Sequence, residues 1–100
     1  MAEYFLVKRT HGASWDPSRV RRDQDGWDDH AAFMDELVAG GVIVLGGPVG
    51  DGDGTHALLV MDVGSEAEVR ERLAADPWGE NMLKTESIEP WSIFLRRERG

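Results

Sequence analysis

Alternating side chains mark the first segment of the chain. Residues 3–10 (EYFLVKRT) are rich in aromatic and branched side chains and predict a β-strand. Neighbouring side chains in a strand point to opposite faces, so Phe5 and Val7 share one face. Tyr4 and Leu6 share the other. Both faces are apolar at the start of this strand, so we expect both to be covered by other parts of the protein.

A helical period replaces this alternation from residue 27. Apolar side chains then recur three to four positions apart, which predicts an amphipathic helix over residues 27–39. The predicted buried stripe consists of Trp27, Ala31, Met34, Leu37 and Val38. A second helix is predicted to begin after Ser65 as N-cap, with Glu68 three residues later as in a capping box. We expect Pro77 to end it, because proline disfavours helical backbone before it.

The remaining apolar runs predict three further strands. Residues 42–45 and 55–63 would form a hairpin around the acidic, glycine-rich turn at 50–54. The last strand is predicted from about residue 87 to 96. Its side chains spaced for burial are Ile88, Trp91, Ile93 and Leu95. The polar connection at 11–25 is long for a loop without structure, so we expect a lid or rim there.

The predicted order is strand, helix, strand, strand, helix, strand, which is the ferredoxin-like βαββαβ arrangement. The expected fold class is therefore α+β, with a four-stranded antiparallel sheet and both helices on one face. We expect residues 1–100 to form a single domain. Because the other sheet face would be left bare, we expect a homodimer in which two sheets stack face to face.

Composition narrows the range of partners. Eleven basic residues against 19 acidic ones give a net charge of -8, which excludes the basic surface that nucleic acids and anionic membranes require. The N-terminus lacks the pattern of a signal peptide, and the uncharged, glycine-rich stretch 39–50 is too short to span a bilayer. With no cysteine there is neither a disulfide framework nor a thiolate metal site. We therefore expect a cytoplasmic protein.

Two residues are candidates for chemistry. His30 lies at the edge of the apolar stripe of the first helix, where an imidazole can act as general acid or base. It can equally be a half-buried histidine bonded to backbone. Asp76 precedes Pro77 at a helix C-terminus, where the helix dipole disfavours a negative charge. It is either an acid of the terminating turn or, folded back, the carboxylate that orients His30.

A glycine-rich stretch could shape a pocket beside these residues. Gly46 and Gly47 leave room for a ligand or another backbone to approach, and with Pro48 they could form a pocket floor. The whole segment 46–54 is first of all a hairpin turn, since it lacks the residues of a phosphate loop or of an EF-hand. Trp78 is either a core residue or a pocket wall.

No cofactor or metal motif accompanies these candidates. The histidines at 11, 30 and 56 lack the spacing of a metal site, and we expect those at 11 and 56 to be surface residues.

Taken together, these segments resemble the YCII-related (YciI-like) family over nearly the whole chain. The resemblance is carried by four motifs in the correct order: H-x-x-F-M-x-x-L at 30–37, LGGPV at 45–49, ADPW at 75–78 and EPW at 89–91. The resemblance implies a dimeric αβ-barrel and a His-Asp active site, which would map onto His30 and Asp76. One branch of the family looks like a dehydrochlorinase that acts on a chlorinated hydroxyquinol. Related dimeric barrels include muconolactone isomerases and monooxygenases that act without a cofactor.

Two functional hypotheses follow. In the first, a small enzyme without cofactor binds a planar aromatic or lactone-type molecule, His30 moves a proton and Asp76 orients His30; Gly46, Gly47, Pro48 and Trp78 shape the pocket. In the second, the protein is a dimeric small-molecule-binding or accessory module, in which His30 and Asp76 are a structural pair.

Overall fold

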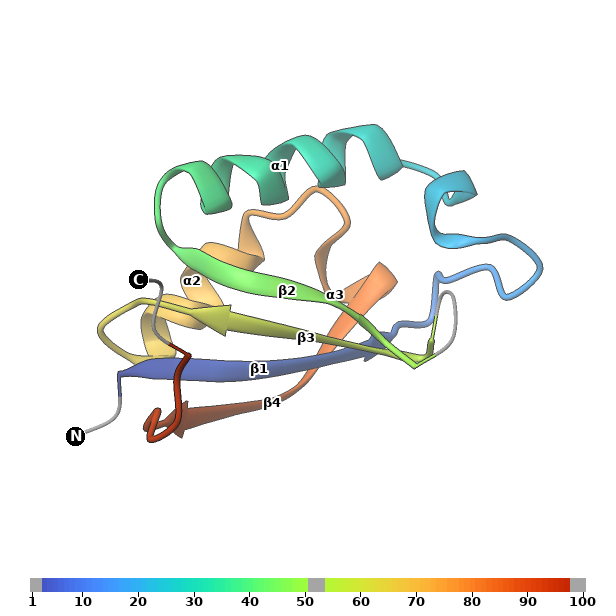
Figure 1. Cartoon of the computed structure of the whole chain (residues 1–100). Helices are drawn as coiled ribbons and strands as arrows, with labels where there is room; N and C mark the ends of the chain where they lie inside the picture. The colour runs from blue at the N-terminus through green and yellow to red at the C-terminus, as the bar shows by residue number, and fades with distance from the viewer. Residues whose placement is uncertain (1–2, 51–53, 98–100) are drawn as a thin grey trace.

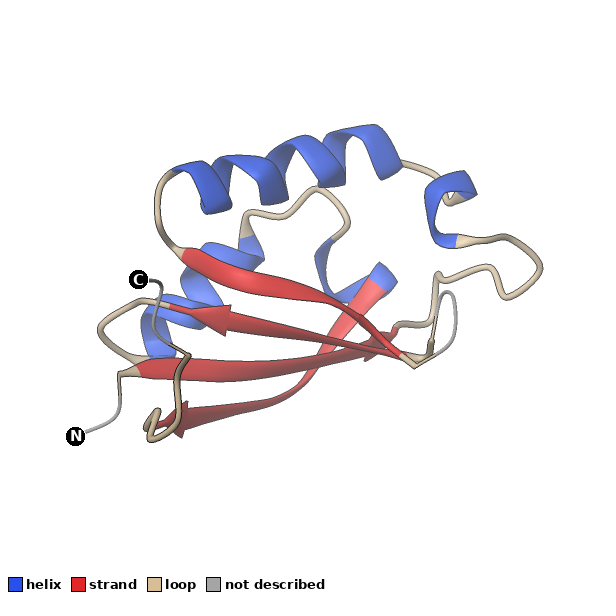
Figure 2. Ribbon diagram, viewed as in Figure 1, coloured by secondary structure: helices blue, strands red, loops and turns tan. Residues whose placement is uncertain are grey.

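The computed structural model describes residues 3–50 and 54–97, which form a four-stranded antiparallel sheet with helices packed on one face (Figures 1 and 2). The elements are β1 (Tyr4–His11), η1 (Arg21–Asp23), α1 (Trp27–Ala39), β2 (Ile43–Val49), β3 (His56–Met61), α2 (Glu66–Ala74), α3 (Gly79–Met82) and β4 (Leu83–Trp91). The strand order β2-β3-β1-β4 is ferredoxin-like, which confirms the predicted fold class. Residues 51–53 of the predicted turn and 98–100 lie outside the described residues.

The main core lies between the sheet and the helices α1 and α2. Val7 of β1 is fully buried there, and its neighbours Leu59 and Met61 of β3 are paired with β1 in register. The buried members of the cluster are Val7, Leu37, Ile43, Leu59, Met61, Val69 and Leu73. Each such side chain stabilises the fold by roughly 1.5–3 kcal/mol on burial. Phe5 packs against this cluster, so Phe5 and Val7 share one face of β1, as the alternation predicted.

Both long helices form as predicted at their N-termini. α1 has the predicted bounds and follows Gly26, which adopts a left-handed φ of 79° that glycine tolerates best. The hydroxyl of Ser65 accepts a hydrogen bond from the Glu68 amide at 3.1 Å and caps α2. α2 ends at Ala74, before the predicted limit at Pro77.

The strand β2 extends further than predicted. Gly46 and Pro48 were expected to follow the strand as a turn, but they pair with Leu59 and Ala57 of β3 within it. A Cβ atom on Gly46 would lie 2.6 Å from a Leu59 methyl carbon. The glycine therefore allows this strand to lie close to its neighbour. The short helix α3 was not predicted.

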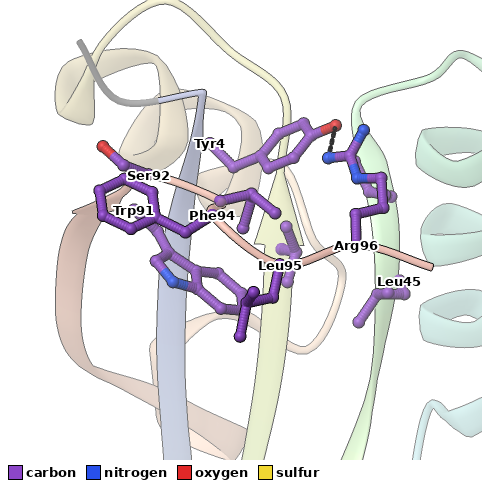
Figure 3. A pocket seen from close by; sticks show the side chains of 10 residues that line it. Tyr4, Leu45, Trp91, Ser92, Phe94, Leu95 and Arg96 are labelled. Atoms are coloured by element: carbon purple, nitrogen blue, oxygen red, sulfur yellow. Dashed lines mark hydrogen bonds between the residues drawn. The ribbon is translucent and has the colours of Figure 1, made fainter. Parts of the chain in front are cut away.

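The last strand ends earlier than predicted, at Trp91, because Trp91 pairs with Tyr4 at the start of β1. Beyond this point β4 has no partner strand, and residues 92–97 turn back across the open face of the sheet (Figures 1 and 3). The predicted burial of this segment was wrong for Trp91 and Leu95, which are 42% and 93% exposed.

The open face of the sheet carries a broad apolar hollow of about 590 Å³. Tyr4, Leu45 and Trp91 line it together with the returning segment, as Figure 3 shows. The Arg96 guanidinium crosses this hollow and donates to the Tyr4 hydroxyl at 3.1 Å. This face, opposite the helices, therefore leaves apolar side chains exposed.

Candidate active site

The structure brings His30 and Asp76 together. His30 lies in the first turns of α1, and Asp76 follows the end of α2. The imidazole Nδ1 atom lies 2.9 Å from each carboxylate oxygen of Asp76. Both residues are at least nine-tenths buried. The contact on which the dyad hypothesis depends is therefore present.

The Asp76 carboxylate is held in its charged form. Burial by itself would raise its pKa, but the hydrogen bonds from His30 and from the Trp78 amide, together with the charge of Arg9, outweigh burial and lower the pKa below its ordinary value of 3.8. The Trp78 amide donates to Asp76 Oδ1 at 2.9 Å. Asp76 is thus an acceptor fixed from several directions.

This arrangement determines which nitrogen of His30 is available for chemistry. An ionised carboxylate only accepts hydrogen bonds, so Nδ1 must carry a hydrogen whether or not the ring is charged. Among the described residues, none forms a hydrogen bond with Nε2. Nε2 is therefore the nitrogen that can gain or release a proton, as in other histidines oriented by a carboxylate.

Arg9 is a site residue that the sequence analysis missed. Its Nη1 lies 3.3 Å from Asp76 Oδ2, and its Nη2 donates to the Leu83 carbonyl at 3.0 Å. Only 1% of Arg9 is exposed. The signal was available in the alternation: Arg9 shares the face of Val7, so a charged side chain was directed toward the core.

Trp78 lies behind His30 rather than on the cavity wall where it was predicted. The two rings are stacked, with centroids 4.0 Å apart and planes inclined by 9°. The indole N–H donates to the Asp25 carbonyl at 2.7 Å, and Trp78 is not among the residues that line the cavity. Trp27 forms the aromatic wall in its place. Trp78 thus fixes the plane of the imidazole.

A cavity of about 260 Å³ lies in front of His30, between α1 and the sheet. Gly46, Gly47 and Pro48 line it at the position proposed for them from the sequence. Its apolar wall consists of Trp27, Met34, Val38, Ile43, Ala57, Leu59 and Leu83, and its charged or titratable side chains are Arg9, Arg21, His30 and Asp35. The cavity can enclose a small apolar ring with polar groups directed at His30.

The connection at 11–25 is a packed rim. Trp15 is buried and meets Trp78 edge to face, with centroids 5.8 Å apart. The buried Gln24 side chain donates to the carbonyls of Asp16 and Arg19 at 2.7 and 2.9 Å. These contacts form a folded loop that carries Arg21 to the cavity.

The other histidines lie apart from this site. His11 was expected at the surface, but it stacks on Trp15 with ring centroids 3.9 Å apart. His56 Nε2 lies 3.3 Å from Glu86. Within residues 3–50 and 54–97, no group of three or more His, Cys, Asp or Glu side chains is arranged to hold a metal ion. Over the same residues, no helix is long and apolar enough to cross a membrane.

Comparisons with known proteins agree with the fold. No curated protein matches the sequence. Among solved structures, the chain is similar to 5-chloro-2-hydroxyhydroquinone dehydrochlorinase from Burkholderia phenoliruptrix AC1100, in complex with 2,5-dihydroxybenzoquinone. The two are 26% identical with a TM-score of 0.58, over 97% of this chain and 95% of the other. The model of the YCII-related domain matches residues 3–92. With this match over most of its length, the chain belongs to the family of YCII-related domains.

Proposed function

We propose that this protein is a small enzyme that transfers a proton to or from a small hydroxylated aromatic or lactone-type molecule without a cofactor. The observation that carries the proposal is the buried contact of His30 Nδ1 with Asp76 at 2.9 Å, on the wall of an apolar cavity. A histidine in this arrangement is a general base whose protonated form is stabilised by the carboxylate.

The chemistry follows from the free nitrogen. Nε2 of His30 removes a proton from a hydroxyl or an acidic C–H group of the substrate, and Asp76 stabilises the imidazolium that forms. The proton then returns to another substrate atom or leaves to solvent. The cavity volume of about 260 Å³ is below the roughly 300 Å³ at which drug-sized pockets begin. A single substituted ring is the kind of substrate that suits a cavity of this size.

The similar dehydrochlorinase supports this substrate class. It was solved with 2,5-dihydroxybenzoquinone, a planar ring with acidic hydroxyl groups. Loss of hydrogen chloride from a chlorinated, hydroxylated ring requires that one proton is removed from the ring system and that chloride departs. His30 at the wall of an apolar cavity is suited to accept such a proton.

Turnover and binding measured with the same variants test the proposal. Chlorinated hydroxyhydroquinones serve as substrates with chloride release as readout, and 2,5-dihydroxybenzoquinone as ligand with calorimetry as readout. We expect His30→Gln to reduce turnover by about 10²- to 10⁴-fold while the fold is retained. His56→Gln, which alters a histidine outside the cavity, is the matched control. If the wild-type protein and His30→Gln bind the ligand with equal affinity and neither turns over substrate, the protein is a binding module instead.

We also propose that two copies associate through their open sheet faces. Leu45, Trp91 and Leu95 are 63%, 42% and 93% exposed on or beside that face. Apolar patches of this kind mark association surfaces, and a second copy of the same face is the simplest self-complementary cover. A monomer mass by light scattering at micromolar concentration would contradict this part of the proposal.

A further inference from the structure

We propose that Arg9 is a positioning residue that acts through Asp76: it offsets part of the carboxylate charge, so that His30 stays an uncharged base until substrate is present. This inference rests on the proposed function, because it explains how the His30–Asp76 pair is kept ready to accept a proton. Arg9 is not expected to react itself.

The geometry gives one carboxylate two cationic or potentially cationic neighbours. Oδ2 of Asp76 faces Nη1 of Arg9 at 3.3 Å and Nδ1 of His30 at 2.9 Å. The guanidinium is anchored on its other side by the Leu83 carbonyl at 3.0 Å. Both side chains are essentially removed from solvent. The charge of Arg9 therefore acts on Asp76 with little screening by water.

The charge balance decides the resting state of His30. A buried carboxylate paired with a histidine alone favours the charged imidazolium, which cannot accept another proton. With Arg9 present, the pair of Asp76 and Arg9 is already neutral. The tendency of His30 to take up a proton and become charged is therefore reduced. Two other charged side chains line the same cavity as His30, namely Arg21 from η1 and Asp35 from α1. On the far side of the pair, a Glu80 carboxylate oxygen from α3 lies 3.9 Å from Arg9 Nη2.

A purely structural role accounts poorly for Arg9. Its Nε atom is buried and has no hydrogen-bond partner among the described residues, which is unfavourable for stability. Buried ion pairs are often replaceable by apolar side chains without loss of stability. Val7, two residues earlier on the same strand face, shows the apolar alternative. The burial of a charged side chain at this position therefore points to a role in the site.

The test follows the protonation of His30 directly. Ring-nitrogen chemical shifts of His30 are recorded by NMR across the pH range in the wild-type protein, Arg9→Met, Arg9→Gln and Arg9→Lys. In the neutral variants we expect the ring to stay charged to a pH higher by about one unit or more, which is a tenfold change in the equilibrium. Arg9→Lys keeps the charge, so its transition should stay close to that of the wild-type protein.

Two results would overturn the inference. One is an unchanged transition in either folded neutral variant. The other is a shift in Arg9→Lys of the same sign and at least the size expected for the neutral variants, because packing and not charge would then be the cause. If both neutral variants fail to fold, the wild-type titration decides: a His30 ring that is still charged at about pH 7 would overturn the inference, because the resting base would not be uncharged. The titration uses no substrate, so it remains valid if chloride release fails and the proposed function is wrong.

Discussion

The two faces of the sheet use the same kinds of side chain in opposite ways. Lys8 and Arg9 are neighbours on β1, yet Lys8 is 42% exposed and pairs loosely with Glu86 at 3.6 Å. Arg9 is 1% exposed and forms part of a network with Asp76 and His30. On the helix side charges are buried inside an apolar setting, and on the open side apolar groups are exposed.

This difference teaches that burial, and not residue type, distinguishes the charged network on the helix side from the charged pairs on the open side. Charges excluded from water interact strongly and can set the protonation of a neighbour. Exposed pairs such as that of Lys8 and Glu86 are screened and contribute little.

Asp76→Asn should have the largest effect. It removes the charge shared by Arg9 and His30 and leaves a buried guanidinium without its anion. We expect a loss of about 3–5 kcal/mol in the free energy of unfolding, typical of breaking a buried pair, measured by urea denaturation. Asp62→Asn, at an exposed position beyond β3, is the matched control. Equal stability of both variants would show that the buried network contributes nothing.

Leu45→Lys tests the open face alone. A lysine at this exposed apolar position should be excluded from a face-to-face interface. A penalty of about 1.4 kcal/mol or more would raise the dissociation constant of the dimer at least tenfold, as measured by analytical ultracentrifugation. Val20→Lys, also exposed but on the connection before η1, should leave the mass unchanged. The two faces are coupled if ligand binding in the cavity falls as well.

Lowering the pH should reduce the contribution of the buried Asp76 network to the free energy of unfolding. The pKa of Asp76 is lower in the folded protein than its ordinary value of 3.8. Its contribution is therefore complete above that value and is lost as pH falls through the lower folded pKa. The stability difference between wild type and Asp76→Asn should shrink below about pH 3.8. A difference that stays constant down to pH 2, on the order of two pH units lower, would argue against the charged carboxylate.

Glu86→Gln should have the smallest effect. It weakens two ion pairs on the open side, with Lys8 at 3.6 Å and with His56 at 3.3 Å. Because all three side chains are about 40% exposed, we expect a loss below about 1 kcal/mol in the same denaturation assay, diminishing further in high salt. A loss approaching that of Asp76→Asn would remove the contrast between the faces.

Local pattern was sufficient for the elements and for one half of the site. The 3.6-residue period predicted α1 with its observed bounds and placed His30 at the edge of its apolar stripe. Alternation correctly placed Phe5 and Val7 on the same face of β1, which the structure shows to be the one that the helices cover. These properties depend on neighbours a few positions apart, which a sequence displays directly.

Features set by distant partners were not predictable in this way. The end of β4 at Trp91 depends on where β1 begins, and the role of Arg9 depends on a carboxylate 67 positions later. A charged residue in a strand is ordinarily solvent-exposed, so its inward direction was overlooked. The sequence left Trp78 as either a core residue or a pocket wall, and only the folded structure shows that it stacks on His30.

The position of β1 between β3 and β4 has a consequence for how the protein is made. Arg9 reaches Asp76 and Leu83 across 67 and 74 positions, and His30 reaches Asp76 across 46. Contacts so far apart in sequence close late, because long loops must be ordered first. On the ribosome, the first strand must wait for nearly the whole chain before its second neighbour emerges. Assembly of the candidate site therefore depends on nearly the whole chain, because Leu83 at the start of β4 also holds the Arg9 guanidinium.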